Sequence, residues 1–164
     1  MTLSAEDQQH LDAAEGYAAL GLNLDANDEL EEITADVRHM PKVLKVRFLV
    51  YSALEKWELA EIVAERLVAA ERDKPLWHLS LATAICRTRG MEAAASILRI
   101  AVEEIPREAS LQYHLAQYEC LLGDLVEARA RLATAFRLDG KFRSQALDEP
   151  NLKPLWDSLG EASG

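Results

Sequence analysis

The sequence predicts an all-α protein, built as a solenoid of about four helix pairs with a C-terminal cap. The first observation is a period, because Ala60, Ala94 and Ala128 stand 34 residues apart. Two further columns repeat at the same interval: Leu67, Ala101 and Ala135, and Phe48, Ala82 and Ala116. A fixed period of this length is typical of stacked-repeat proteins, in which each unit buries its apolar face against its neighbours.

Composition agrees with a helical array. Of the 164 residues, 49% are hydrophobic, and only seven are glycine and five proline, so a core can form without disulfides or metal. The net charge of −10 disfavours binding of nucleic acid or an anionic membrane. No apolar run is long enough to span a bilayer, and the polar N-terminus MTLSAEDQQH is not a secretory signal. With two cysteines, which we expect to be reduced, these features predict a cytoplasmic protein.

Helical periodicity predicts the elements as pairs along the chain. Pro41 and Pro75 fall in the first turn of a helix, where the missing N–H costs nothing, and Pro106 lies just past a helix end. Gly90 and Gly123 fall in the tight turns between paired helices, where positive φ is often needed. The predicted pairs are 7–20 with 27–39, 41–54 with 58–71, 75–88 with 92–104, and 109–122 with 125–138.

The segment after residue 142 does not continue the repeat. Leu152, Leu155, Trp156 and Leu159 follow the spacing i, i+3, i+4, i+7, which places them on one helical stripe. A single apolar stripe at the end of an array predicts a cap that covers the exposed face of the last unit. We assign this cap to residues 143–160.

The units resemble tetratricopeptide repeats (TPRs), whose pattern is a large residue, Leu-Gly, Tyr, a later Ala-x3-Phe, Ala and Pro. The third unit carries this pattern as His78, Leu81-Ala82, Ile85, Ala94, Leu98, Ala101 and Pro106. The resemblance implies one right-handed superhelical domain over 1–164, with repeats at about 7–40, 41–74, 75–108 and 109–142. The closing segment is similar to that of many bacterial TPR proteins, which suggests a bacterial source.

The same resemblance implies that partners bind in a concave groove lined by the first helix of each pair. Steps of three or four residues along those helices predict the lining side chains. The first pair offers Gln8, Leu11, Glu15, Ala18 and Ala19, and Ala53 belongs to the second. The predicted partner-binding residues are Lys42, Lys45, Leu49, Ser52, Leu76, Leu79, Thr83, Cys86, Arg87, Tyr113, Gln117 and Cys120.

This groove is apolar to mildly basic in an acidic chain, so we expect a protein partner that supplies an amphipathic peptide or helix. Leu49, Leu79 and Tyr113 are the predicted anchors, and Lys45 and Arg87 would orient an acidic residue of the partner. Three alternatives stay open. The chain's own tail covers the groove, a second copy covers it to give a homodimeric structural adaptor, or the chain is a regulatory subunit of an enzyme complex.

Signals for catalysis or metal binding are missing from the sequence. It has no Gly-rich phosphate loop, nucleophile elbow or recognisable triad, and no His-x3-His or Cys-x2-Cys spacing, so we expect no enzyme, cofactor or metal site. Cys86 and Cys120 occupy equivalent places on neighbouring units, about 8–10 Å apart, which is too far for a disulfide. The acidic run 25–36 stabilises a helix N-terminus or, alternatively, docks a basic partner.

Overall fold

The computed structural model describes residues 2–161, and these form helices and turns without a β-strand. The chain divides into two compact units, Met1–Trp77 and His78–Gly164, which are described separately below as unit 1 and unit 2. The all-α class that the sequence predicts is confirmed. None of the helices in residues 2–161 combines the length and the apolar character that crossing a membrane requires.

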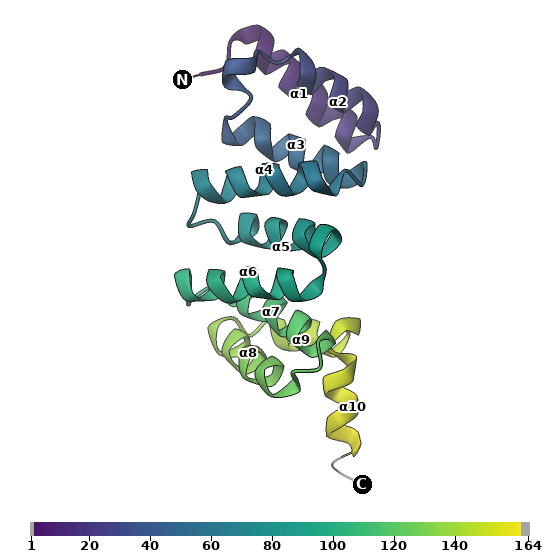
Figure 1. The fold of residues 1–164 in the computed structure, drawn as a ribbon, viewed down its shortest axis with the longest axis vertical. Coiled ribbons are helices and arrows are strands. Elements are labelled where there is room, and N and C mark those ends of the chain that lie inside the picture. The colour runs from purple at the N-terminus through teal and green to yellow at the C-terminus, as the bar shows by residue number, and fades with distance from the viewer. Residues whose placement is uncertain (1, 162–164) are drawn as a thin grey trace. The chain divides into compact units, whose positions relative to one another are not determined.

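Unit 1 is built from two helix pairs and a short 3-10 turn (Figure 1). Helix α1 (Ala5–Ala19) packs against α2 (Asn23–Glu32), and α3 (Pro41–Ala53) packs against α4 (Trp57–Ala70). The turn η1 (Ala35–Val37) joins the pairs. The core between them is aliphatic and consists of Leu11, Ala14, Ala26, Leu30, Ile33, Val37, Val43, Val46 and Val50.

Helix α2 differs from the predicted helix over 27–39: it begins four residues earlier, at Asn23, and ends at Glu32. At Ile33 the backbone becomes extended, with φ −62° and ψ 133°. The N–H of Thr34 then donates to the Asp7 carboxylate at 2.7 Å, and the Arg38 guanidinium donates to the Ile33 carbonyl at 2.6 Å. Side chains from outside the helix thus satisfy the backbone groups at its end, which periodicity alone does not reveal.

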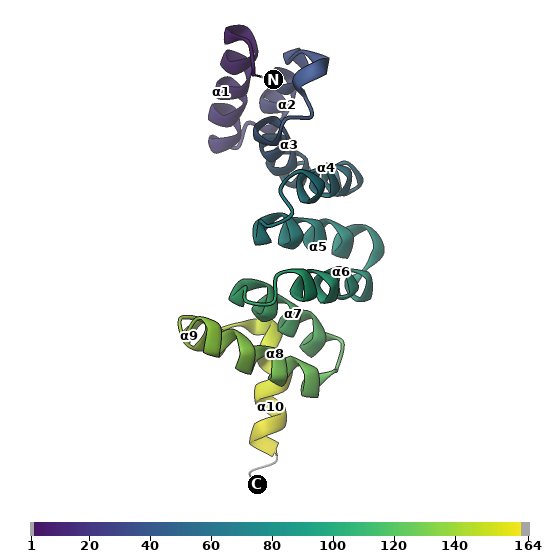
Figure 2. The same ribbon diagram turned by 90° about the vertical axis from the view of Figure 1, so that its left-hand side faces the viewer.

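Unit 2 holds the later helices (Figure 2). Helix α5 (Pro75–Arg89) starts in unit 1 and continues into unit 2, where α6 (Met91–Glu104), α7 (Ala109–Leu121) and α8 (Leu125–Leu138) follow. Apart from α2, every helix of the four pairs ends within two residues of its predicted bounds. The repeated small residues lie in the core, with at most 1% of their surface exposed: Ala60, Ala82, Ala94, Ala101, Ala116, Ala128 and Ala135.

The tight turns use the left-handed backbone region. Gly21, Gly90 and Gly123 have φ of +76°, +93° and +90°, as expected for a residue without a Cβ. Glu55 occupies the equivalent turn between α3 and α4 with φ +55°, and it is the only non-glycine residue of the described chain in this region. This turn therefore carries backbone strain that the glycine turns avoid.

The predicted C-terminal cap is present on the last pair. Helix α9 (Phe142–Leu147), η2 (Pro150–Leu152) and α10 (Lys153–Glu161) pack on α7 and α8 (Figure 2). Leu152 and Leu155 are fully buried, and the Trp156 indole donates to the Ala146 carbonyl at 3.0 Å. The apolar stripe of the tail closes the core of unit 2, which its sequence spacing predicted.

Candidate functional site

Six side chains predicted to line the groove, together with Asn23 and Val46, surround a cavity of about 460 Å³ in unit 1. Helix α1 contributes Glu15, Ala18 and Ala19, and α3 contributes Lys45, Val46, Leu49 and Ala53, with Asn23 at the start of α2. Three alanines on two facing helices leave room for the backbone of another segment to approach closely. We call this cavity the α1–α3 groove.

Lys45 contacts two groups from the segment that follows α4, the Glu71 carboxylate and the Trp77 ring. Its Nζ lies 3.4 Å from the Glu71 carboxylate and 5.2 Å from the centre of the Trp77 ring, within the range of cation–π attraction. The Trp77 indole donates to the same carboxylate at 2.7 Å, and this bond, with the charge of Lys45, lowers the pKa of Glu71. A cation positioned in this way can meet an acidic group of a partner without ordering a free side chain first.

The other predicted partner-binding residues of unit 1 differ in how far they are exposed to solvent. Leu49 is 61% exposed and Leu76 is 58% exposed, so both present apolar surface to solvent. Lys42 is exposed, and its Nζ donates to the Gln8 side chain of α1 at 2.9 Å. Ser52 is half-buried, and its hydroxyl has no hydrogen-bond partner among the described residues.

In unit 2 the predicted groove residues of α7 are covered by the chain itself. Tyr113 is only 4% exposed, because its ring stacks on Phe142 of α9. The side chain of Asn151, in η2, donates to Gln117 at 3.2 Å. Cys120 is buried in the same cluster as Leu155, and burial raises the pKa of its thiol. Of the alternatives left open by the sequence, coverage by the tail therefore describes α7, and Tyr113 cannot serve as an anchor for a partner.

The predicted residues on α5 keep varying degrees of exposure. Leu79 and Cys86 are half-buried, whereas Thr83 and Arg87 are exposed. The Cys86 thiol lies beside Tyr118 of α7, and burial, together with this thiol, raises the pKa of Tyr118 to about 12. Cys86 and Cys120 are both free thiols, in agreement with the distance argument from the repeat spacing.

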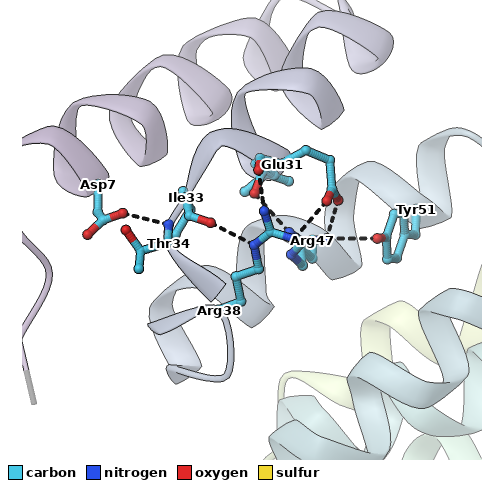
Figure 3. Close-up of polar contacts among 8 residues, drawn as sticks. Asp7, Glu31, Ile33, Thr34, Arg38, Arg47 and Tyr51 are labelled. Atoms are coloured by element: carbon cyan, nitrogen blue, oxygen red, sulfur yellow. Dashed lines mark hydrogen bonds and ion pairs between the residues drawn. The ribbon is translucent and has the colours of Figure 1, made fainter. Parts of the chain in front are cut away.

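A buried arginine cluster in unit 1 was missed by the sequence analysis (Figure 3). Arg47 of α3 donates to the Glu31 carboxylate at 2.8 Å, to the Tyr51 hydroxyl at 2.9 Å and to the Leu30 carbonyl at 2.8 Å. Arg38 donates to the second oxygen of Glu31 at 2.9 Å. The signal was available, because Arg47 stands where the later units have Leu81 and Leu115, which are core residues.

Two acids of the run 25–36 contact basic side chains of unit 1 itself. Glu31 is engaged by two arginines, and Glu29 accepts a hydrogen bond at 2.7 Å from His10, whose pKa is raised by this contact. These two acids therefore serve packing between helices of unit 1. Residues 2–161 contain no group of three His, Cys, Asp or Glu side chains placed to hold a metal ion.

Unit 2 has its own buried charge at Glu119, which is 2% exposed. Its carboxylate lies 3.4 Å from the Arg99 guanidinium and 3.9 Å from that of Arg131. Burial raises the pKa of Glu119, while the two arginines oppose this change. Glu119, like Arg47, is a charged residue in a repeat column that is otherwise uncharged. The earlier units have Tyr51 and Ile85 in the column of Glu119.

Comparisons with known proteins place the fold but not the family. No protein-family model matches the chain, and no curated protein matches it. Solved structures of MamA do match. The structure described as MamA MSR-1 is 23% identical, with a TM-score of 0.65, and covers 80% of this chain and 76% of its own. A MamA RS-1 double mutant is 19% identical, with a TM-score of 0.70, and covers 85% and 77%.

A third structure, MamA AMB-1, is 19% identical and has a TM-score of 0.64 over 96% of this chain and 88% of its own. MamA is a TPR-like superhelix. The fold is TPR-like. At this level of identity the similarity extends to the arrangement of the helix pairs. It does not extend to the residues that line the α1–α3 groove.

Proposed function

We propose that this protein is a non-catalytic interaction module that binds an amphipathic peptide or helix of a partner protein in the α1–α3 groove. The observation that carries the proposal is Leu49, an aliphatic side chain left 61% exposed beside a cavity whose lining includes three alanines. Burying such a side chain contributes about 1.5–3 kcal/mol. A volume of about 460 Å³ lies within the range of about 300–1,000 Å³ typical of ligand sites.

The charges of the groove favour one orientation of the bound segment. Lys45 offers a fixed cation and Glu15 an anion, and both line the same cavity. A helix with an acidic residue toward Lys45 and a basic residue toward Glu15 would satisfy both, and its apolar face would cover Leu49. Leu79 and Arg87, on unit 2, stay predicted contacts of the partner.

The test is affinity capture from a lysate of the source cells with three tagged baits: wild type, Leu49→Glu and Leu147→Glu. Leu147 is 73% exposed on α9, so it controls for the loss of an exposed leucine elsewhere. We expect a protein that wild type and Leu147→Glu retain and that Leu49→Glu loses. Circular dichroism of each bait verifies folding.

Two outcomes would contradict the proposal. Equal capture by all three baits would move the interaction away from the α1–α3 groove. A mass near twice the 18.3 kDa chain in light scattering, returned to the monomer by Leu49→Glu, would identify a second copy as the occupant.

A further inference from the structure

A second cavity, of about 220 Å³, lies on unit 1 and is not part of the α1–α3 groove. Its basic lining comes from Arg38, Arg47 and Arg66, and its apolar lining includes Leu59 and Ile62 of α4. We call it the arginine pocket. Arg47 follows Lys45 by two residues on α3, which is about 200° around the helix, so the two cavities use different faces of that helix.

Arg47 forms the fixed part of the arginine pocket. Its side chain is nine-tenths buried, and its Nη atoms are held by Glu31, Tyr51 and the Leu30 carbonyl (Figure 3). Its Nε, however, is buried and has no acceptor within the part of the chain that the structure describes. Buried donors without an acceptor are rare in folded proteins, so the Arg47 guanidinium keeps hydrogen-bonding capacity that no described residue uses.

Arg66 forms the accessible part. It is exposed on α4 and makes no ion pair or hydrogen bond with any residue in the range 2–161. Leu59 and Ile62, which precede it by seven and four residues, share its face of the helix and are 43% and 47% exposed. An unpaired guanidinium, whose planar fork matches a carboxylate, thus stands beside exposed aliphatic surface.

The local charge differs in sign from that of the chain. Three arginines and no acid line the pocket, and Glu31, which pairs with two of the arginines, already accepts from both Arg38 and Arg47. The chain as a whole carries −10. A basic pocket on an acidic protein favours the binding of an anion at this place over the acidic parts of the surface.

We propose that the arginine pocket binds an acidic peptide segment of a partner protein. A carboxylate of the peptide pairs with Arg66 and reaches the Arg47 edge, and a neighbouring aliphatic side chain covers Leu59 and Ile62. The volume is below the range of about 300–1,000 Å³ typical of small-molecule sites, which favours a single inserted side chain over a cofactor. The apolar wall favours a carboxylate with attached hydrocarbon over a free phosphate.

The test uses a capped peptide with the core Glu-Leu-Leu-Glu and a matched peptide with Gln-Leu-Leu-Gln, each titrated to millimolar concentration into the ¹⁵N-labelled full chain. The readout is the Nε–H resonances of Arg47 and Arg66 in two-dimensional NMR. We expect the acidic peptide to shift both resonances and the neutral peptide to shift neither. Arg66→Gln should weaken binding at least about tenfold, because a charge-assisted bidentate contact is lost.

Matched variants separate this site from others. Arg129→Gln removes an exposed arginine on α8 that likewise has no partner in residues 2–161, and it should leave binding unchanged. Leu49→Glu alters only the α1–α3 groove and should also leave it unchanged, so failure of one proposal does not decide the other. Ile62→Gln should weaken binding of the acidic peptide. Arg66→Lys should bind this peptide more tightly than Arg66→Gln but less tightly than wild type.

Three results would overturn the proposal: no shift of Arg47 or Arg66 at millimolar peptide, equal shifts from the acidic and neutral peptides, or unchanged affinity in Arg66→Gln. Competition by inorganic phosphate at the same concentration as the peptide would instead assign the pocket to a phosphate group, and this would also overturn it.

Discussion

The Tyr113 ring stacks on the Phe142 ring, with centroids 4.6 Å apart and planes inclined by 29°. Through this contact the C-terminal segment occupies the face of α7 that the repeat pattern assigns to partner binding. The binding surface available on unit 2 is therefore smaller than the sequence predicts. The α1–α3 groove of unit 1, which no described tail residue lines, keeps its exposed leucine.

Phe142→Ala should destabilise unit 2 by about 3–4 kcal/mol, because it removes a buried aromatic side chain and leaves a cavity against Tyr113. Urea denaturation measures this loss. In a Cys86→Ser background the same variant should make the Cys120 thiol reactive toward a thiol reagent. The control Leu147→Ala, at an exposed position of α9, should change stability by no more than about 0.5 kcal/mol. A Cys120 that stays protected in Phe142→Ala would show that Phe142 is not needed to hold the tail on α7.

Asp7→Asn should lower the melting temperature at neutral pH and reduce the acid sensitivity of unit 1. The Ser4 hydroxyl and the Thr34 N–H bond to the Asp7 carboxylate and hold its pKa at about 2, below its ordinary 3.8. Stability from a lowered carboxyl pKa is present above the ordinary pKa and is lost as the pH falls through the folded value. Wild type should therefore lose melting temperature between about pH 4 and pH 2 more steeply than the variant.

Asp28→Asn supplies the control for Asp7, since Asp28 is exposed on α2 and accepts no hydrogen bond from the described residues. It should behave like wild type over the same pH range. Parallel curves for wild type and Asp7→Asn would contradict the role of Asp7 in joining α1 to the end of α2.

The combined change Arg99→Met and Arg131→Met should destabilise unit 2 by about 3 kcal/mol at neutral pH, because it leaves the Glu119 carboxylate buried and unpaired. The loss should shrink as the pH is lowered. Burial raises the pKa of Glu119, so the folded state takes up a proton more readily than the unfolded state.

Adding Glu119→Leu to the two arginine changes should recover most of the stability, since no buried charge then remains. Denaturation at several pH values measures wild type and both variants. A loss that is independent of pH, or that Glu119→Leu fails to reduce, would assign the effect to packing of the arginine side chains instead.

Glu55→Gly should stabilise the protein by about 1 kcal/mol, because Glu55 holds φ +55° in a turn where Gly21 and Gly123 serve in other pairs. Thermal melting detects the change. Ala69→Gly, at an exposed position inside α4, should destabilise by up to about 1 kcal/mol and shows what glycine does without a positive φ. A lower melting temperature for Glu55→Gly would mean that contacts of the Glu55 side chain outweigh the strain.

The sequence predicted most of the fold because repeat periodicity is a local signal. Alanines such as Ala60 and Ala94 are small where helices meet, and prolines and glycines mark the ends of helices, so both patterns can be read along the chain. The end of α2 was missed because Asp7, 27 residues away in sequence, accepts from the Thr34 N–H just past this end, and the Arg38 side chain donates to the Ile33 carbonyl. A helix end stabilised from elsewhere leaves little local trace.

The candidate site likewise includes residues that the sequence predicted and residues that only the structure placed. The resemblance to tetratricopeptide repeats assigned the groove to the first helix of each pair, and helical spacing then selected Glu15, Ala18, Lys45 and Leu49, which line one cavity. Only the tertiary structure decided that Tyr113 is covered and that Arg47 lines the arginine pocket, because burial depends on which distant segment packs where. Periodicity fixes which face of a helix a side chain occupies, whereas its neighbours across space are set by the free energy of packing the whole unit.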